Sequence, residues 1–404
     1  MSLIYFDNAA TSWPKPPQMI EAMTQFNDSI GGNPGRSGHR LSIEAARVVY
    51  EARERVAELI HAPDPLSIAF TKNATEAINC VLFGLLEPGD HAVTSSMEHN
   101  SVMRPLRFLE RQGVKLSIVP CSQTGEFDPE DAKRVMNKNT KAVIVTHASN
   151  VTGTLLPIDS LAGVAREHDA LLIVDASQTA GCLPIDVIRT GIDILCFTGH
   201  KSLLGPQGTG GFYIRKGVEE RVRPLMHGGT GSASEFEEQP DFSPDRFESG
   251  TPNAIGLAGL AAGIKFVRDT GIERIREKEI RLTRLFLDGI KTIPDTILFG
   301  PWEANKRTAV VSFNIEGVSP SDLAFELDEP FAILSRPGLH CAPAAHRTMG
   351  TFPQGTVRFS FGLYTTEDEI RRGLAAVARA RAAYHTTKGE SHVRINKRDR
   401  ACLP

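Results

Sequence analysis

The segment Leu171-Leu172-Ile173-Val174-Asp175-Ala176-Ser177-Gln178 decides the fold class of this chain. Its first four residues are apolar without alternation, which is typical of a strand that is buried on both faces of a sheet. Helical patterns separate this run from similar ones. The predicted strands cover residues 67–70, 91–94, 115–119, 141–146, 171–175, 194–198 and 210–214. This alternation predicts an α/β domain with a mostly parallel sheet.

The pattern changes after Gly250-Thr251-Pro252, where long helices replace the short alternating elements. Helical patterns cover residues 255–269, 274–292, 319–329 and 366–384, and strand patterns cover 308–315, 332–336 and 356–360. This mixture predicts a second, smaller α+β domain. Residues 388–404 are polar and basic with little apolar content, and we expect a flexible tail there.

Composition excludes several classes of protein. The 404 residues include 45 Lys and Arg against 48 Asp and Glu, and a net charge of -3 argues against a nucleic-acid binder. The chain has no run of about 18 apolar residues that could span a membrane. Its N-terminus lacks the pattern of a signal peptide. We therefore expect a cytoplasmic protein whose six cysteines are reduced thiols.

Polar residues follow the predicted strands at the sheet edge where α/β proteins bind ligands. Asp175 and Gln178 follow one strand, Thr198, His200 and Lys201 follow the next, and Thr75 lies at a strand-to-helix turn. Each run alone also has a plain interpretation. Asp175 or Thr75 could be a helix N-cap, and Lys201 could be a solvated loop residue. No Walker loop, dinucleotide fingerprint or zinc-protease motif is present.

Together these residues fit one cofactor, pyridoxal 5'-phosphate (PLP). Its chemistry needs a lysine for a Schiff base, a carboxylate beside the pyridine nitrogen, a phosphate site and a group stacked on the ring. The chain supplies these groups in the order Thr75, His99, Asp175, Gln178, His200 and Lys201. His340 and His346 lack a supporting carboxylate cluster, so we expect no metal site.

The motifs that carry these residues resemble those of class V aminotransferase-fold enzymes and, more narrowly, of the cysteine desulfurases. They are Asp7-Asn8-Ala9-Ala10-Thr11-Ser12, Thr75-Glu76, Glu98-His99-Asn100, Ser149-Asn150-Val151-Thr152-Gly153-Thr154, Asp175-Ala176-Ser177-Gln178 and Thr198-Gly199-His200-Lys201. The resemblance runs from about Tyr5 to about Arg379. It implies a type I PLP-dependent transferase fold and a homodimer. The large domain, with a seven-stranded sheet, would span residues 15–265, and the small domain residues 1–14 and 266–387.

The resemblance also implies roles for individual residues. Lys201 would bind the cofactor covalently, Asp175 would pair with its pyridine nitrogen, and His99 would stack on its ring. Gln178 and Asn150 would contact the phenolic oxygen of the ring. The expected phosphate ligands are Ala74, Thr75, Thr198 and His200, with Thr251 reaching the phosphate of the neighbouring subunit.

The segment Arg336-Pro337-Gly338-Leu339-His340-Cys341-Ala342 resembles the active-cysteine loop of the SUF-type, or group II, desulfurases. Cys341 would be the nucleophile, and positive neighbours such as His340 and Arg336 favour a reactive thiolate. Arg358 would bind the substrate carboxylate bidentately, with Arg336 and Asn150 as further substrate contacts. A surface ion pair is the alternative interpretation of Arg358.

The activity implied by the resemblance is conversion of L-cysteine to L-alanine. Sulfur would pass as a persulfide on Cys341 to an acceptor protein, as in iron-sulfur cluster assembly. Other reactions on the same scaffold remain open at this point. They are selenocysteine lyase acting on L-selenocysteine, a cysteine C–S lyase and an epimerase. A scaffold without catalytic activity is a further alternative, against which the intact Lys201 and Asp175 argue.

Overall fold

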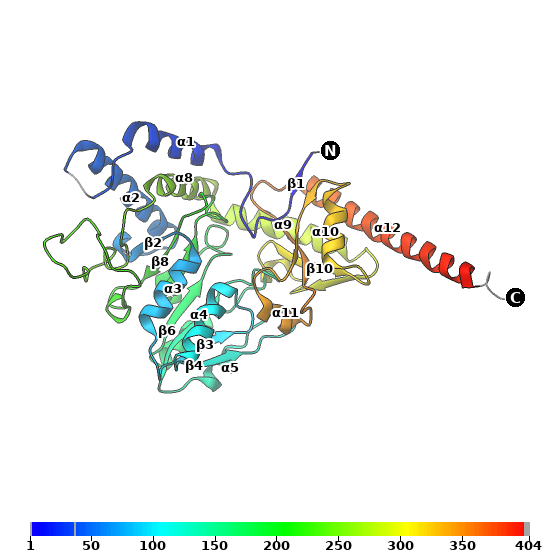
Figure 1. Ribbon diagram of the computed structural model, residues 1–404, viewed down its shortest axis with the longest axis horizontal. Helices are drawn as coiled ribbons and strands as arrows, with labels where there is room; N and C mark the ends of the chain where they lie inside the picture. The colour runs from blue at the N-terminus through cyan, green and yellow to red at the C-terminus, as the bar shows by residue number, and fades with distance from the viewer. Residues whose placement is uncertain (1, 36–37, 400–404) are drawn as a thin grey trace.

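The computed structural model describes residues 2–35 and 38–399, and side chains within these ranges through residue 384. A seven-stranded sheet forms the large part of the molecule, with strand order β2-β8-β7-β6-β5-β3-β4 (Figure 1). Its strands are β2 (Ile68–Thr71), β3 (His91–Ser95), β4 (Lys115–Val119), β5 (Thr140–Thr146), β6 (Leu171–Asp175), β7 (Ile194–Thr198) and β8 (Gly210–Ile214). Only β8 runs antiparallel to its neighbours. The predicted mostly parallel sheet is confirmed.

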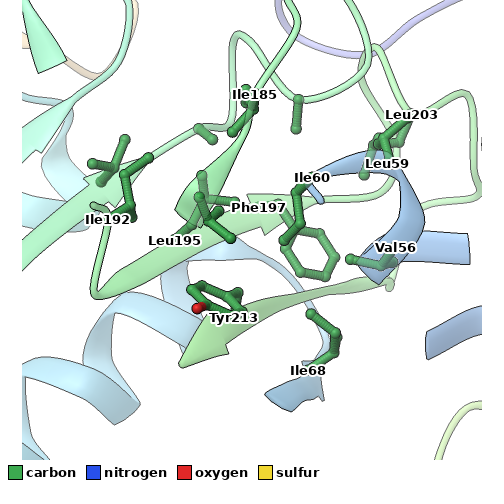
Figure 2. Packing of buried hydrophobic residues seen from close by; sticks show 14 of the residues in the cluster. Val56, Leu59, Ile60, Ile68, Ile185, Ile192, Leu195, Phe197, Leu203 and Tyr213 are labelled. Carbon is green, nitrogen blue, oxygen red and sulfur yellow. The ribbon is translucent and has the colours of Figure 1, made fainter. Parts of the chain in front are cut away.

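The central strand β6 is buried on both faces, as its unbroken apolar run predicts. Leu172 and Val174 belong to one hydrophobic cluster, whereas Leu171 and Ile173 belong to another on the opposite face. Figure 2 shows the first cluster where β7 and β8 pack against the residues that end α2 (Arg40–Leu59). Burying a side chain of this size stabilises a fold by about 1.5–3 kcal/mol. The double-sided core therefore holds the strand ends, and the polar residues after them, in fixed positions.

Helices cover both faces of the sheet (Figure 1). Those between the strands are α3 (Ala74–Leu85), α4 (Asn100–Arg111), α5 (Pro129–Val135), α6 (Ile158–Glu167) and α7 (Val187–Thr190). The N-terminal helices α1 (Pro17–Gln25) and α2 pack against α8 (Ala254–Thr270). The sequence analysis did not predict α1 and α2. None of the helices in the described part of the chain is long and apolar enough to cross a membrane.

The smaller part of the molecule is built around a four-stranded antiparallel sheet. Its order is β12 (Arg336–Gly338), β13 (Thr356–Ser360), β10 (Val310–Ile315) and β9 (Thr296–Phe299). The first strand of the chain, β1 (Ile4–Tyr5), pairs with β11 (Ile333–Leu334). Both ends of the described chain thus contribute to this part, although the predicted domain boundaries stay a prediction.

Helices complete the smaller part, and two of them differ from the helices predicted from the sequence. The predicted helices correspond to α9 (Ile272–Ile290), α10 (Pro320–Asp328) and α12 (Glu367–Asp399). α12 extends into the segment expected to be a flexible tail, and residues 400–404 lie outside the described residues. The arginine and lysine residues of this segment favour the continuation because they are good helix formers. A short unpredicted helix, α11 (Pro343–Met349), follows the cysteine loop.

Candidate active site

The carboxyl ends of the parallel strands open into a cavity of about 210 Å³ between the two parts of the molecule. Residues from β6, from β7 and from the small sheet meet in its wall. The predicted site residues that line it are Ala74, Thr75, His99, Asn150, Asp175, Gln178, Thr198, His200, Lys201, Arg336 and Arg358. The folded chain therefore brings together residues that are more than 250 positions apart in the sequence.

The N-terminus of α3 faces this cavity with backbone N–H groups. Asn73 is the N-cap, and its side-chain oxygen accepts a hydrogen bond from the Glu76 amide at 3.0 Å. The interpretation of Thr75 as the N-cap is therefore wrong. A Cβ atom at Gly210 would lie 2.7 Å from the Asn73 Cα atom, so only glycine allows this strand to approach the turn. The amides of Ala74 and Thr75 belong to a helix end that favours an anion.

Asp175 ends β6 and is 4% exposed. Its Oδ1 atom accepts hydrogen bonds from the Ser177 amide at 2.9 Å and the Ser177 hydroxyl at 2.5 Å. These bonds orient the carboxylate, which also lines the cavity. Gln178, on the same loop, donates to the Ala9 carbonyl at 3.2 Å. A buried, oriented carboxylate can pair with a cationic nitrogen in the cavity.

Lys201 lines the same cavity as Asp175. Burial lowers the pKa of its amine to about 8, while Asp175 acts in the opposite direction and Arg358 and Arg336 lower it further. The Ser12 hydroxyl donates to the backbone carbonyl of Lys201 at 2.8 Å and anchors its main chain. The amine is thus much more often neutral near pH 7 than an exposed lysine would be, and a neutral amine is what a nucleophilic lysine needs.

His99 is the N-cap of α4, and its Nδ1 atom accepts a hydrogen bond from the Ser101 amide at 3.0 Å. Burial, and after it the positive charge of Lys201, lower the pKa of His99 to about 4. The ring is therefore neutral at physiological pH, with its proton assigned to Nε2 by the hydrogen bond at Nδ1. A neutral, immobilised ring that lines the cavity can stack on a flat ligand.

Two polar side chains after β7 lack partners within the described residues. The Thr198 Oγ1 and His200 Nδ1 atoms are buried and accept or donate no hydrogen bond there. The backbone of His200 is fixed instead, because its carbonyl accepts from the Ser12 amide at 3.1 Å and from Lys15 Nζ at 2.6 Å. Unpartnered buried polar atoms that line a cavity indicate that the cavity takes a polar ligand.

Arg358 on β13 is 1% exposed and makes a buried ion pair. Its Nη2 atom donates to Asp7 Oδ1 at 2.7 Å, and its Nη1 atom donates to the Asn150 carbonyl at 3.0 Å. The alternative interpretation of Arg358 as a surface ion pair is therefore wrong. The Nε atom has no partner in the described part of the chain. Asp7, to which the sequence analysis assigned no role, belongs to the site through this pair.

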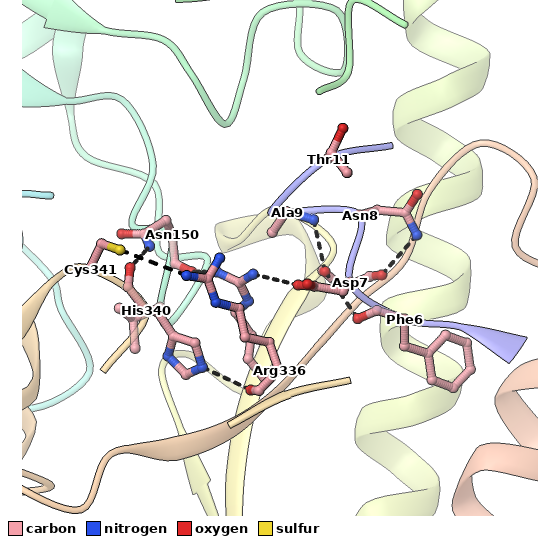
Figure 3. A network of polar contacts seen from close by, with 12 residues as sticks. Phe6, Asp7, Asn8, Ala9, Thr11, Asn150, Arg336, His340 and Cys341 are labelled. Carbon is pink, nitrogen blue, oxygen red and sulfur yellow. Dashed lines mark hydrogen bonds and ion pairs between the residues drawn. The ribbon is translucent and has the colours of Figure 1, made fainter. Parts of the chain in front are cut away.

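Cys341 lies in an exposed turn between β12 and α11 (Figure 3), and its neighbours His340 and Arg336 line the cavity. Arg336 Nη2 is 3.7 Å from the Cys341 sulfur atom, so the expected cationic neighbour is present. The other expected cation, His340, is 3% exposed, and burial lowers its pKa well below the ordinary value. The expectation of a positive charge on His340 is therefore wrong, because a buried imidazole stays neutral.

The remaining described cysteines differ from Cys341 in their surroundings. Cys80, Cys182 and Cys196 are buried, as their apolar runs predict. Burial raises the pKa of the Cys80 and Cys121 thiols to about 11. Cys341 alone among the described cysteines is exposed, and Cys402 lies outside the described residues. Exposure beside a guanidinium makes Cys341 the thiol best suited to react.

Comparison with known proteins agrees with this geometry. The family model described as aminotransferase class-V matches residues 4–372. The chain belongs to the class-V aminotransferase family. A probable cysteine desulfurase of Pyrococcus abyssi is 37% identical over 383 residues, which cover 93% of each chain.

The fold of this class-V aminotransferase chain is similar to the solved structures of cysteine desulfurases. The apo structure of the cysteine desulfurase from Thermococcus onnurineus has a TM-score of 0.89 and 35% identity, and the match covers 94% of this chain and 95% of that one. The cysteine desulfurase CsdA from Escherichia coli, in an S-sulfonic acid form, has a TM-score of 0.83 and 30% identity over 94% of each chain. The expected type I fold is confirmed.

Two further predictions concern Thr251 and metal binding. Thr251 is exposed and does not line the cavity of its own chain. Its expected contact with a neighbouring subunit stays a prediction. Within residues 2–35 and 38–399, no group of three or more His, Cys, Asp or Glu side chains could hold a metal ion.

Proposed function

We propose that this chain is a PLP-dependent cysteine desulfurase, which converts L-cysteine to L-alanine and transfers the sulfur atom through Cys341. The observation that carries the proposal is a cavity lined by a buried lysine and a buried carboxylate, with an exposed cysteine next to its lining residue His340 and 3.7 Å from its lining residue Arg336. Relatives of similar length that carry the name cysteine desulfurase support it. An aminotransferase proper would need no exposed thiol beside the cavity.

The residues of the cavity fit PLP in charge and in hydrogen-bonding capacity. The open N-terminus of α3 and the unpartnered Thr198 and His200 side chains suit a phosphate group. Asp175 suits a protonated pyridine nitrogen, and Gln178 with Asn150 suits a phenolic oxygen. His99 would contribute a neutral ring face. When bound, PLP supplies an electron sink for negative charge that develops at the substrate Cα atom.

Lys201 has two tasks in this proposal. Its neutral amine would bind the cofactor covalently, and after the substrate displaces it the amine would accept the proton from the substrate Cα atom. A pKa near 8 suits both tasks, since the amine can accept and release a proton close to working pH. Asp175 opposes complete neutralisation of the lysine and thereby keeps its pKa from falling further.

Arg358 and Arg336 would bind the carboxylate of L-cysteine. Asp7 already neutralises one of these two guanidinium groups, so the pair keeps a net positive charge for a second carboxylate. The unpartnered Nε atom of Arg358 provides a donor for that carboxylate. Asn150 would help to orient the substrate, because its backbone carbonyl fixes Arg358 and its side chain fixes the cysteine loop.

Cys341 would attack the sulfur atom of the substrate as a thiolate. A sulfur–sulfur bond forms on the enzyme while the carbon–sulfur bond of the substrate breaks. The electron pair of that broken bond stays on the substrate Cβ atom, which takes up a proton and becomes the methyl group of L-alanine. The enzyme is left with one persulfide per alanine. An exposed loop suits the next step, transfer of the terminal sulfur atom to an acceptor protein.

The proposed active unit is a homodimer in which Thr251 of each subunit reaches the phosphate site of the other. Thr251 follows a long segment without helices or strands that includes the exposed side chains Phe236 and Phe242. Apolar side chains of this size on a surface are typical of a protein interface. The family's symmetry would make each site shared. The sulfur acceptor would then approach the face that carries Cys341.

Two variants and two substrates test the function. L-Alanine release from L-cysteine and from L-selenocysteine, with sulfide from the first substrate and selenide from the second, is measured for the wild type, Lys201→Ala and Cys341→Ala. We expect Lys201→Ala to lose all turnover and the borohydride-reducible cofactor adduct. Cys341→Ala should keep the cofactor absorbance and lose persulfide and most alanine from L-cysteine.

L-Selenocysteine separates the alternatives, because a selenol is a better leaving group and needs less nucleophilic help. Retained activity of Cys341→Ala on L-selenocysteine alone agrees with the proposal. If Cys341→Ala releases alanine from L-cysteine at the wild-type rate, the desulfurase mechanism is excluded and a lyase replaces it. A borohydride-reducible adduct in Lys201→Ala would mean that another lysine binds the cofactor.

A further inference from the structure

The loop that carries Cys341 has a backbone conformation that L-residues rarely adopt. His340 and Cys341 have φ angles of 49° and 58°, in the left-handed region, and Gly338 has a φ angle of 101°. Neither His340 nor Cys341 is a glycine or asparagine, for which this region is less costly. Such a conformation persists only where surrounding contacts determine it.

Four hydrogen bonds hold this loop. His340 Nε2 lies 2.9 Å from the Arg336 carbonyl oxygen, and the Asn150 side-chain amide donates to the His340 carbonyl at 2.7 Å (Figure 3). The Asn100 backbone amide donates to the Cys341 carbonyl at 2.8 Å. The fourth bond runs from the Ala342 backbone amide to the Leu339 carbonyl at 2.8 Å and closes the turn inside the loop. The His340 bond also lies inside the loop, and it connects the side chain of residue 340 to the main chain four residues earlier.

The bond between His340 and Arg336 fixes the residue whose charge is next to the thiol. Arg336 presents its carbonyl to the His340 imidazole and its guanidinium to the Cys341 sulfur atom, 3.7 Å away. The imidazole itself is buried at 3% exposure and packs beside the His346 ring, with ring centroids 5.4 Å apart. Because the ring is neutral and turned toward a carbonyl, it cannot act on the thiol as a charge.

We propose that His340 is a positioning residue, whose imidazole N–H ties the loop to the Arg336 carbonyl and keeps the Cys341 sulfur atom beside the Arg336 guanidinium. The consequence for sulfur transfer rests on the proposed function. The hydrogen bond between His340 and the Arg336 carbonyl, called the tie below, does not rest on it, because this bond is a property of the folded loop. Breaking it releases the left-handed turn, and the thiol leaves its cationic neighbour.

Four variants separate the tie from simple packing and from backbone strain. His340→Leu fills the space without a donor, and His340→Gln keeps an N–H group that can reach the same carbonyl. His340→Gly removes the strain, because glycine accepts a positive φ angle, but it also removes the donor. His61→Leu is the matched control, since His61 has a φ angle of 56° and an imidazole 3.2 Å from the Ile185 carbonyl, outside the cavity.

Hydrogen exchange of the full chain, measured by mass spectrometry, reads the loop without reference to catalysis. Peptides that cover residues 337–342 and the Asn100 amide report its opening. We expect exchange there to be roughly fivefold or more faster in His340→Leu and His340→Gly, because a net hydrogen bond is worth about that factor. His340→Gln should stay within about twofold of the wild type, and His61→Leu should leave both peptides unchanged.

Steady-state kinetics then tests the consequence for Cys341. The expected result is a loss of roughly fivefold or more in kcat for His340→Leu and His340→Gly, with KM for L-cysteine within about twofold and recovery in His340→Gln. Unchanged exchange and unchanged kcat in His340→Leu, or full activity of His340→Gly, overturns the proposal. If the exchange result is obtained but the wild type releases no alanine from L-cysteine, the tie stands and the proposed function fails.

Discussion

The state of the Lys201 amine can be tested by changing the pH at which the cofactor-free chain takes up PLP. The pKa of this amine is lowered from 10.5 to about 8, chiefly by burial. At pH 7 an amine with the ordinary value is neutral in roughly 0.03% of molecules, whereas one with a pKa of 8 is neutral in roughly 9%. The cavity thus raises the reactive fraction about 300-fold.

The sign of the pH dependence follows from the direction of this shift. Only the neutral amine can attack the cofactor aldehyde, and lysine becomes neutral as pH rises through its pKa. The rate of cofactor attachment should therefore increase about tenfold from pH 6 to pH 7 and less than about twofold from pH 8 to pH 9. An ordinary lysine would instead give about tenfold per unit over the whole range.

Stopped-flow visible absorbance measures this rate in a single-turnover mixture of cofactor-free chain and PLP. The ionisation of PLP itself is corrected with a small-molecule amine measured in the same buffers, and Lys201→Ala gives the background. A rate that still rises tenfold per unit between pH 8 and pH 9 would show an unperturbed amine. The burial argument for Lys201 would then be wrong, and its catalytic pKa would need another source.

Two further predictions concern the substrate and the assembly. Arg358→Lys should raise KM for L-cysteine roughly 10- to 100-fold with a smaller change in kcat, because lysine cannot make the paired hydrogen bonds of a guanidinium; an unchanged KM in steady-state kinetics would remove Arg358 from substrate binding. Light scattering should give a dimer for the wild type, and Thr251→Ala should weaken PLP binding in that dimer by roughly tenfold. A fully active monomer would contradict the shared site.

Much of the fold could be predicted from the sequence because the apolar runs and the helices between them alternate so regularly. All seven strands of the large sheet occur within about two residues of their expected bounds. The missed helix α2 carried a readable signal. Its buried residues Ala45, Val49, Ala52 and Val56 recur at helical spacing, but the charged residues between them lower its average hydrophobicity.

The polar residues of the site could be predicted because chemistry in α/β folds gathers at the carboxyl ends of strands. Pairings between distant segments could not be predicted in this way. Asp7 and Arg358 are 351 positions apart, and only the pairing of β1 with β11 and the packing of the first residues on β13 bring them together. The motif that contains Asp7 could be recognised in the sequence, but its ion pair with Arg358 could not.

Burial keeps the His340 imidazole neutral, and for that reason the charge expected for it from the sequence was wrong. A histidine beside a cysteine suggests a cation, yet at 3% exposure the imidazole stays neutral and acts as a hydrogen-bond donor. The positive charge near Cys341 then comes from the guanidinium of Arg336, whose side chain is only partly buried. Arg336 therefore provides the charge near Cys341, and His340 fixes the main chain of Arg336. A substitution at either position should therefore weaken sulfur transfer, but only substitutions at His340 should loosen the loop.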